Sequence, residues 1–378
     1  MNKNWRRSGG SIKNSGPILG VFFILSLVFS PAGCVKPLPA QAEFVMGTIC
    51  SVNLYNRGTR DLYQSLFARL RELEGILSAN REGTDVDAVN RNAGIGPVPV
   101  RPELIEVLSA ARDYAERSGG TFDPTIGPLV KLWGIGGDAP RVPGEEEIRK
   151  ALALVNWRDL LIDRAAGTVF LKRPGMALDP GAIAKGYAAD ELVRILREAD
   201  IPGAVIDLGG NVFAYGSRTG GGSRGEPWRI GIQDPLADRG VYIGILRVHN
   251  KSVVTSGVYE RTFEADGKDY HHILSVQDGY PVNNGILSVT VIADRSLDAD
   301  ALSTAAFTLG YGRGRTLVES VPGAEALFVF DDKSIRGTGG VWEIFTLTDT
   351  NYRILTNSIS KTRKVFPGMA PFPAPRSP

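Results

Sequence analysis

The sequence predicts an α+β protein in which largely antiparallel sheets pack against helices. In the first half of the chain, apolar residues recur at helical spacing, whereas from Trp228 onward most segments alternate apolar and polar residues as strands do. Asp266-Gly267 has the composition of a two-residue hairpin turn, which joins neighbouring strands in antiparallel order. These patterns give no firm internal domain boundary.

Each expected element has its own local signal. The first helix carries one apolar stripe, made of Leu62, Leu66, Leu70, Leu73 and Leu77. The second ends at a glycine pair, which is a helix stop signal. The helices expected are residues 59–77, 102–118 and 145–152, followed by one that opens at Asp179 and one near Asp298. The strands expected are residues 42–55, 204–208, 241–248, 252–256 and 287–293, with hairpin-like passages over 157–169 and 261–274 and a flexible loop over 217–225.

The first residues have the organisation of an export signal. An apolar run over residues 18–29, too short for a comfortable membrane span, follows four basic residues, Lys3, Arg6, Arg7 and Lys13. Small residues then precede Cys34, as in lipoprotein cleavage sites, so we expect a signal peptide over residues 1–33 and a lipid on Cys34. Ala40-Gln-Ala42 is an alternative site for ordinary cleavage. With either site, the folded part is expected on the extracytoplasmic side, and with the first it is anchored to a membrane.

Composition narrows the range of partners. The net charge of +2 argues neither for nucleic acid nor for an acidic polymer as a partner, so no nucleic acid is expected. The 45 glycines suit a site where backbone packs closely around a ligand. Once Cys34 is lipidated, Cys50 is the remaining cysteine, so no intramolecular disulfide is expected and Cys50 reads as a small buried residue. The proline-rich residues 360–378 are expected to be disordered.

The segment that opens at Asp179 combines a helix start with a positive charge. Asp179 is a good N-cap and Pro180 suits the first helical position, so the helix is expected to begin there. Gly181 and Gly186 cost helix stability, but they let another backbone or a ligand approach. Lys185 would then lie one turn into the helix, where the helix dipole already favours anions. The alternative is an ordinary capped amphipathic helix with an exposed lysine.

A second segment offers oxygen ligands. Asp300 and Thr304 are four residues apart on an expected helix, so their oxygens lie on one face. Such oxygens suit Mg²⁺, which takes one or two protein carboxylates and completes its shell with water and phosphate oxygens. The alternative is that Asp298 and Asp300 favour the helix N-terminus while Thr304 bonds back to its own helix.

Together these segments resemble the ApbE family, the FAD:protein FMN transferases, from about Phe44 to Phe345. The motifs that carry the resemblance occur in family order, over residues 46–48, 119–134, 179–190, 206–211, 256–261, 270–273 and 298–304. The resemblance implies a T-fold-like architecture and a transferase domain over residues 42–350. It also implies FAD as substrate and Mg²⁺ near the pyrophosphate, held by the carbonyl of Ala182 and the side chains of Asp300 and Thr304.

The same resemblance implies the FAD contacts, which are Met46, Thr121, Phe122, Asp123, Asp179, Lys185 and Ile273. Purely structural alternatives stay open: Met46 could pack in the core, Asp123 could form a turn, and Ile273 could be an ordinary inward-facing strand residue. No Rossmann glycine motif or phosphate loop is present to supply another nucleotide site. Where many relatives carry an aromatic residue after the first long helix, this chain has Asn80, so a stacking contact there is not expected.

Two neighbouring histidines are candidates for the general base. His271 and His272 are expected on one strand, where successive side chains face opposite ways. The match to the family's His-Ile pair favours His272 as the base, with His271 in a structural role.

The activity implied is Mg²⁺-dependent transfer of FMN from FAD to a threonine or serine hydroxyl of an acceptor flavoprotein, with release of AMP. The acceptors implied by the family are subunits of sodium-pumping NADH:quinone oxidoreductases and Rnf-type complexes. Two alternatives remain open: a Mg²⁺-dependent FAD pyrophosphatase, and a lipoprotein that stores FAD without turnover, for which Asn80 is the one supporting feature.

Overall fold

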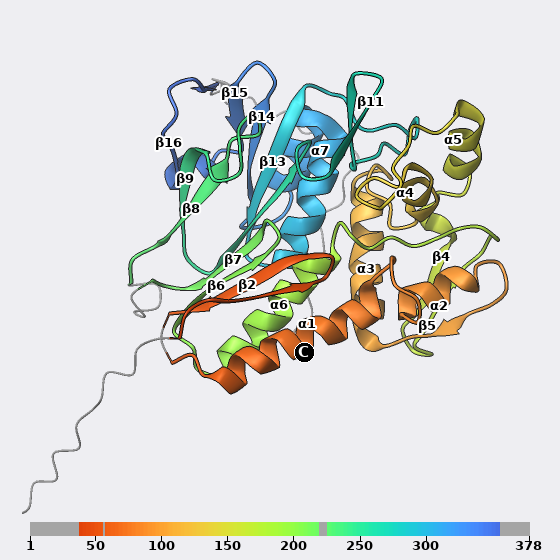
Figure 1. Ribbon diagram of the computed structural model, residues 1–378, viewed down its shortest axis with the longest axis horizontal. Helices are drawn as coiled ribbons and strands as arrows, with labels where there is room; N and C mark the ends of the chain where they lie inside the picture. The colour runs from red at the N-terminus through yellow and green to blue at the C-terminus, as the bar shows by residue number, and fades with distance from the viewer. Residues whose placement is uncertain (1–37, 56, 219–224, 356–378) are drawn as a thin grey trace, which may run out of the picture. The chain divides into compact units, whose positions relative to one another are not determined.

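The computed structural model describes residues 38–55, 57–218 and 225–355 (Figure 1). The predicted signal peptide, Cys34, the proline-rich tail and most of the predicted 217–225 loop lie outside these residues. The helices are α1 (Arg60–Leu77), α2 (Asp85–Arg91), α3 (Pro102–Arg117), α4 (Gly127–Trp133), α5 (Glu145–Leu152), α6 (Ala184–Glu198), α7 (Ser296–Glu319) and α8 (Val341–Ile344). Among the described residues, every helix is too short or too polar to span a bilayer.

One large sheet organises these helices. Its nine strands run in the order β1 (Gln41–Val45), β2 (Thr48–Leu54), β6 (Gly203–Leu208), β7 (Asn211–Gly216), β10 (Lys251–Gly257), β13 (Ile286–Ala293), β14 (Glu325–Phe330), β15 (Ser334–Gly337) and β17 (Arg353–Ile354). Every neighbouring pair is antiparallel except β15 and β17. The predicted α+β class with largely antiparallel sheets is confirmed.

Three small sheets complete the fold. Strands β16 (Phe345–Leu347), β9 (Tyr242–Val248) and β8 (Trp228–Gln233) form one, and β3 (Val98–Pro99), β5 (Thr168–Leu171) and β4 (Leu160–Asp163) form another. Strands β11 (Thr262–Ala265) and β12 (Lys268–His271) form the predicted hairpin, and Asp266 and Gly267 both have positive φ, as a type I′ turn requires.

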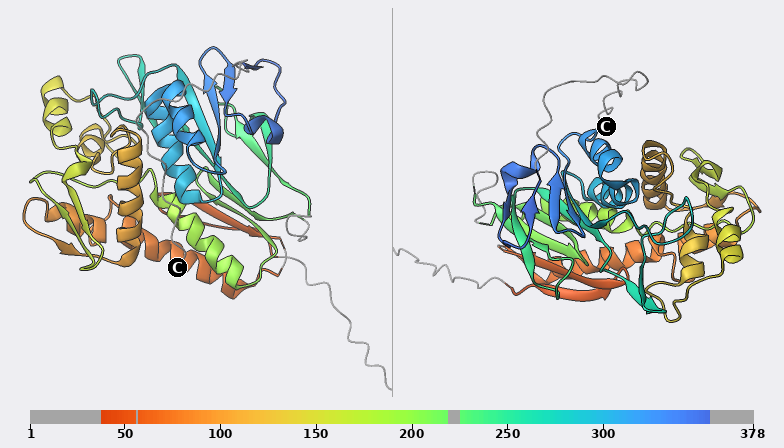
Figure 2. Two further views of the ribbon diagram at one scale, coloured as in Figure 1. Left: turned by 180° about the vertical axis from the view of Figure 1, so that it is seen from behind. Right: turned by 90° about the horizontal axis from the view of Figure 1, so that it is seen from above.

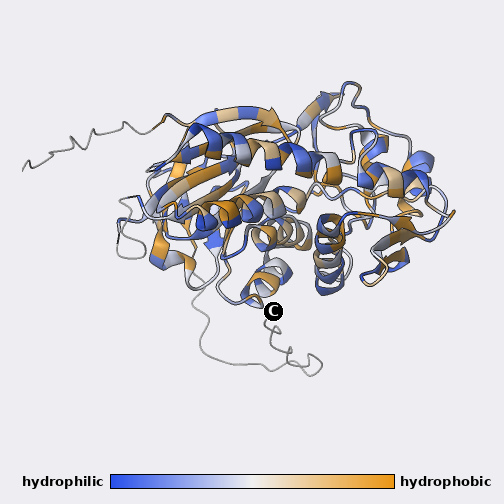
Figure 3. Cartoon of the chain, turned by 90° about the horizontal axis from the view of Figure 1, so that it is seen from below, coloured by the Kyte–Doolittle hydropathy of each residue, from blue (hydrophilic) through white to orange (hydrophobic). Residues whose placement is uncertain are grey.

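Both faces of the large sheet are covered, which explains why all residues of β13 except the half-buried Leu287 are buried. On β10, Val253 packs into the cluster formed with β8, β9 and α8, whereas Val254 packs into the cluster formed with α1, α6 and α7. Seen from behind, α6 and α7 lie in front of the sheet (Figure 2). Coloured by hydropathy, the helices alternate between hydrophilic and hydrophobic residues along their length, as amphipathic helices do (Figure 3).

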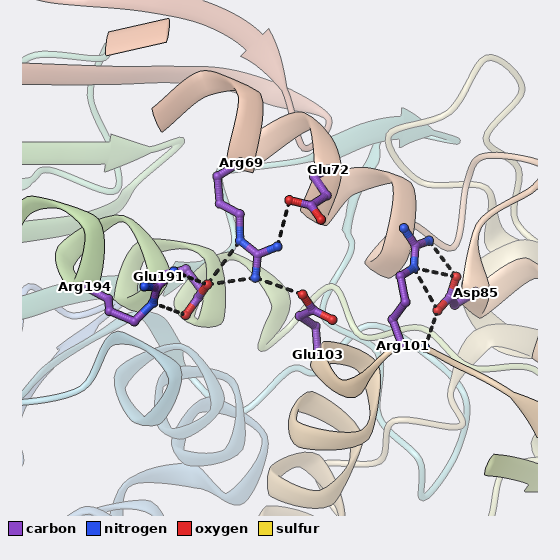
Figure 4. Close-up of polar contacts among 7 residues, drawn as sticks. All are labelled: Arg69, Glu72, Asp85, Arg101, Glu103, Glu191 and Arg194. Atoms are coloured by element: carbon purple, nitrogen blue, oxygen red, sulfur yellow. Dashed lines mark hydrogen bonds and ion pairs between the residues drawn. The ribbon is translucent and has the colours of Figure 1, made fainter. Parts of the chain in front are cut away.

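Helices α1, α3 and α6 are also joined by charge. The guanidinium of Arg69 on α1 is 2.9 Å from Glu103 on α3 and 2.8 Å from Glu191 on α6, and it also pairs with Glu72 (Figure 4). The side chain of Arg69 is only 16% exposed, so water screens these pairs less than it screens surface ion pairs. The network fixes α6 against the helical layer.

Two predicted element boundaries are wrong. The expected strand over 42–55 is a hairpin, because Met46 and Gly47 both have positive φ (57° and 69°) and turn the chain between β1 and β2. The helix expected to open at Asp179 begins at Ala184. The Asp179 carboxylate accepts a hydrogen bond from the Gly181 N–H, 2.8 Å away, which forms a turn ahead of the helix. Lys185 is therefore the second residue of α6 and lies in its first turn.

The other predicted elements are found close to their expected limits. Thr59 caps α1 through its side chain, and the predicted stripe of α1 is buried except for the partly exposed Leu62. Cys50 is fully buried, and burial raises the pKa of its thiol to about 12, which confirms its role as a core residue. Asp278 and Gly279 form a further turn, in which Gly279 has a φ of 78° and Asp278 accepts a hydrogen bond from the N–H of Tyr280.

Candidate active site

Helices α6 and α7 approach each other closely where the predicted metal ligands lie. The N–H of Gly186 on α6 donates to Oδ2 of Asp300 on α7 at 2.8 Å. A Cβ on Gly186 would lie 2.4 Å from the carbonyl oxygen of Ser296, so only glycine permits this spacing. Asp190 on α6 then fixes the first turn of α7, because its carboxylate accepts from the N–H groups of Ser296 (2.7 Å) and Leu297 (3.0 Å).

This contact gives a prediction for stability. Gly186→Ala should lower the free energy of unfolding by about 1–3 kcal/mol, because the added methyl group forces α6 and α7 apart. Gly312→Ala is the matched control, since a Cβ there meets no atom within 4 Å and alanine favours the helix. Chemical denaturation measures both variants. Equal stability of Gly186→Ala and the parent protein would contradict the close packing.

Asp300 is the buried carboxylate of the site, with 4% of its surface exposed. Burial raises its pKa, while the positive charge of Lys185 and the hydrogen bond from Gly186 counter that rise. Thr304 does not bond back to its own helix; its hydroxyl lies 3.2 Å from that of Ser256 on β10. The carbonyl of Ala182 belongs to the turn that precedes α6.

These residues fit a hard divalent cation. Within the described residues, the Gly186 N–H donates to Oδ2 of Asp300, and the Asn211 side chain lies close enough to help lower the pKa of the same carboxylate. No cluster of three or more acidic, histidine or cysteine side chains exists in the same part of the chain, so a bound cation would take mixed oxygen ligands. One carboxylate, a hydroxyl and a carbonyl suit Mg²⁺, whose remaining positions take water and phosphate oxygens.

The structure gives the two histidines different environments. Strand β12 ends at His271, so His272 lies in the bend after the strand and not on it, contrary to the expectation. The ring of His271 is held on both sides, by the Val282 carbonyl (2.9 Å) and the Ile273 N–H (3.3 Å). His272 Nδ1 is buried and has no hydrogen-bond partner among the described residues. Burial, followed by the charges of Arg261 and Lys185, lowers the pKa of His272 to about 3.

Asp179 and Lys185 share this electrostatic environment. Burial raises the pKa of Asp179, and the charges of Arg261 and Lys185 oppose the rise. Lys185 also acts on Asp300 and His272, so its charge is close to both the predicted metal ligands and the predicted base. The structure therefore brings together Asp179, Lys185, His272 and Asp300, which come from three separate segments of the sequence.

The remaining predicted FAD contacts divide into two groups. Ile273 is buried beside His272, and Met46 forms the turn between β1 and β2 while packing on the core. Thr121 lines a cavity of about 210 Å³ with Asn283, Asn284 and Thr308.

The side chains of Phe122 and Asp123, next to Thr121, contact other residues of the protein. Phe122 is buried edge-on against Tyr114. Both oxygens of Asp123 accept hydrogen bonds, from Thr125 and from the N–H of Trp157, as the turn alternative expects. These contacts hold the side chains of the loop over residues 121–123 in place, so its main chain is the part left to contact a ligand.

The structure gives two residues a role at the site that the sequence patterns did not indicate. Asp190 and Arg261 both end motifs that the sequence analysis used, yet neither was given a role. The capping of α7 by Asp190 joins residues 106 positions apart, which no local pattern reveals. Arg261 acts on Asp179 and His272 through its charge, and its position follows only from the folding of β11 and β12.

Comparison with known proteins places this arrangement in a family. The family model described as the ApbE family matches residues 46–328. The FAD:protein FMN transferase of Treponema pallidum is 40% identical over 326 residues, which cover 83% of this chain and 90% of that protein. The FAD:protein FMN transferase of Klebsiella pneumoniae is 37% identical and covers 84% of this chain and 96% of its own length.

Solved structures agree. The crystal structure of the ApbE protein from Thermotoga maritima superposes with a TM-score of 0.73 at 33% identity, over 81% of this chain and 98% of that one. The flavinyl transferase ApbE of Pseudomonas stutzeri, in its apo form, gives a TM-score of 0.68 at 31% identity over the same shares. The resemblance seen in the sequence motifs is confirmed: this chain belongs to the ApbE family.

Proposed function

We propose that this chain transfers FMN from FAD to a threonine or serine hydroxyl of an acceptor flavoprotein and releases AMP. Membership of the family makes the chain an enzyme, an FAD:protein FMN transferase. The metal, the acceptor hydroxyl and the leaving group belong to the proposal. The observation that carries it is the buried, unpartnered Nδ1 of His272 beside the cation Lys185 and the buried carboxylate Asp300.

His272 is suited to accept the proton of the attacking hydroxyl. Because its pKa is lowered, the ring is neutral near neutral pH, which is the form of histidine that can accept a proton. The free Nδ1 is the atom available for that proton. The hydroxyl oxygen then bonds to the FMN-side phosphorus, the bond from that phosphorus to the bridging oxygen breaks, and AMP leaves with the bonding electrons.

Lys185, together with a metal ion held by Asp300, Thr304 and the carbonyl of Ala182, would keep the pyrophosphate in place. Lys185 supplies a positive charge beside the N-terminal end of α6, where anions are already favoured. The three oxygen groups would hold Mg²⁺, which when bound neutralises phosphate charge and orients the pyrophosphate for in-line attack. Asp190 and Gly186 keep α7 in register with α6, which fixes Asp300 relative to the first turn of α6.

Two other activities use the same site. A pyrophosphatase would release FMN and AMP with water as the nucleophile, and a storage protein would bind FAD without turnover. Incubating FAD and Mg²⁺ with and without an acceptor domain separates the three. We expect covalent FMN on the acceptor together with AMP. Free FMN in equal amounts with and without acceptor would favour the pyrophosphatase, and the absence of AMP in both would favour storage.

We also propose that the enzyme acts outside the cytoplasm, anchored to a membrane by a lipid on Cys34. The apolar run ahead of Cys34 supports this location. The acceptors that suit it are extracytoplasmic flavoprotein subunits of sodium-pumping NADH:quinone oxidoreductases or Rnf-type complexes.

The location gives a prediction about processing. Cys34→Ser should leave the protein without lipid, and either uncleaved or cleaved at a later site such as Ala40-Gln-Ala42. Membrane fractionation and gel mobility measure the change. Cys50→Ser is the control, because its thiol is buried and its loss should not affect anchoring. Unchanged anchoring of Cys34→Ser would show that the lipid is elsewhere or absent.

A further inference from the structure

Arg261 is an arginine that the fold holds at the site without giving it a partner. Its carbonyl oxygen accepts a hydrogen bond from the N–H of His272 at 3.2 Å, so the two residues are adjacent across the β11–β12 hairpin. Within the described parts of the chain, its guanidinium forms no ion pair and no hydrogen bond. Other arginines, such as Arg69 and Arg101, are paired with carboxylates.

The stem of Arg261 is packed even though the residue as a whole is exposed. Gly136, in the loop after α4, lies against it, and a Cβ there would be 3.0 Å from Cδ of Arg261. A side chain at position 136 would therefore push against the arginine. This packing distinguishes Arg261 from a freely moving surface cation.

The effect of the Arg261 charge on its neighbours also places this residue close to the site. It helps to lower the pKa of His272 and opposes the rise in the pKa of Asp179, and the same is true of Lys185. The two cations therefore act on the same two groups of the site. A planar guanidinium with free N–H groups suits two oxygens of one phosphate, whereas an ammonium offers a point charge.

We infer that Arg261 binds the pyrophosphate of FAD directly, as a second cation beside Lys185, and stabilises the negative charge that develops as the hydroxyl attacks. This inference rests on the proposed function. Arg261 would contact the oxygens of the phosphorus under attack. It receives no proton in this step, because a guanidinium remains charged, and the hydroxyl proton still goes to His272.

Arg261→Gln tests the inference by binding and by rate. The variant should transfer FMN about 10²-fold more slowly, the usual effect of removing one donor to a developing charge. It should also bind FAD about 10-fold more weakly, as measured by quenching of flavin fluorescence. Riboflavin, which has no phosphate, should bind to the variant as it does to the parent protein. Arg261→Lys should recover part of the rate. Guanidinium ion added to Arg261→Ala should also recover part, which a purely structural role does not explain.

Arg239→Gln is the matched control. The charge of Arg239 acts on Tyr259 and Glu260, which lie near the same site. The Arg239→Gln substitution therefore removes one positive charge there while leaving Arg261 in place. We expect its rate and its affinity for FAD to remain at the parental level. Thermal unfolding confirms that both variants are folded.

Two results would overturn the inference. Either Arg261→Gln keeps the parental rate and FAD affinity, or it loses affinity for riboflavin as strongly as for FAD, which indicates a disturbed site and not a lost phosphate contact. A parent protein that transferred no FMN would contradict the proposed function instead. The FAD and riboflavin titrations would still decide whether Arg261 recognises phosphate.

Discussion

Asp300→Ala should reduce FMN transfer by at least about 10²-fold while the protein remains folded. Asp300 is the one side-chain carboxylate among the proposed metal ligands, and it is buried where α6 meets α7. Without it, the charge of the pyrophosphate is not compensated during attack. A titration of transfer rate against Mg²⁺ concentration measures the effect.

Asp298→Asn is the control on the same helix. Its carboxylate accepts a hydrogen bond from the Tyr114 hydroxyl at 2.7 Å and faces α3, so its replacement should lower stability slightly and leave the Mg²⁺ dependence unchanged. Parental activity of Asp300→Ala at low Mg²⁺ would contradict the metal site.

His272→Ala should bind FAD almost normally and transfer FMN about 10² to 10⁴ times more slowly, because removal of a general base leaves ground-state contacts in place. Flavin fluorescence measures binding, and labelling of an acceptor measures transfer. The pH profile supplies a second readout. Since the fold lowers the pKa of His272, the parent enzyme should lose activity on the acid side only below the ordinary range for histidine.

His271→Ala is the matched control for the base. His271 bonds to the Val282 carbonyl and the Ile273 N–H, so its loss should lower the melting temperature while transfer by the folded fraction continues. If His271→Ala is the inactive variant and His272→Ala is active, the assignment of the base is reversed. Parental transfer by both would exclude histidine as the base.

Local signals predicted most of the fold. Thr59 and the leucine stripe defined α1, and Asp266-Gly267 defined its hairpin, because caps and turns depend on a few neighbouring residues. The failures came where two local signals compete. Asp179 and Pro180 resemble a helix start, but the Asp179 side chain closes a turn onto Gly181 and the helix begins at Ala184.

The sequence prediction missed the turn at Met46 for a different reason. A non-glycine residue with positive φ is uncommon, so an apolar, strand-like sequence gives no sign of it. The structure tolerates this conformation at the same residue that the family resemblance links to FAD, and functional sites are where such conformations concentrate.

The site was less accessible to sequence reasoning than the fold. The resemblance indicated which residues to consider, but not how Gly186 brings α6 to Asp300 or how Asp190 fixes α7. These are contacts between residues more than 100 positions apart, and they depend on the packing of two helices. Nδ1 of His272 finds no hydrogen-bond partner in the described part of the chain, and this too is a property that only the folded chain reveals.

The most direct test of the central claim is intact-mass measurement of an acceptor flavoprotein domain after incubation with the enzyme, FAD and Mg²⁺. We expect the acceptor to gain the mass of one FMN, attached through a phosphoester to a threonine or serine, with one AMP released per acceptor modified. The gain should disappear with Asp300→Ala and with His272→Ala. An acceptor of unchanged mass, in a reaction where FAD is nevertheless split into FMN and AMP, would contradict the claim that a protein hydroxyl is the nucleophile.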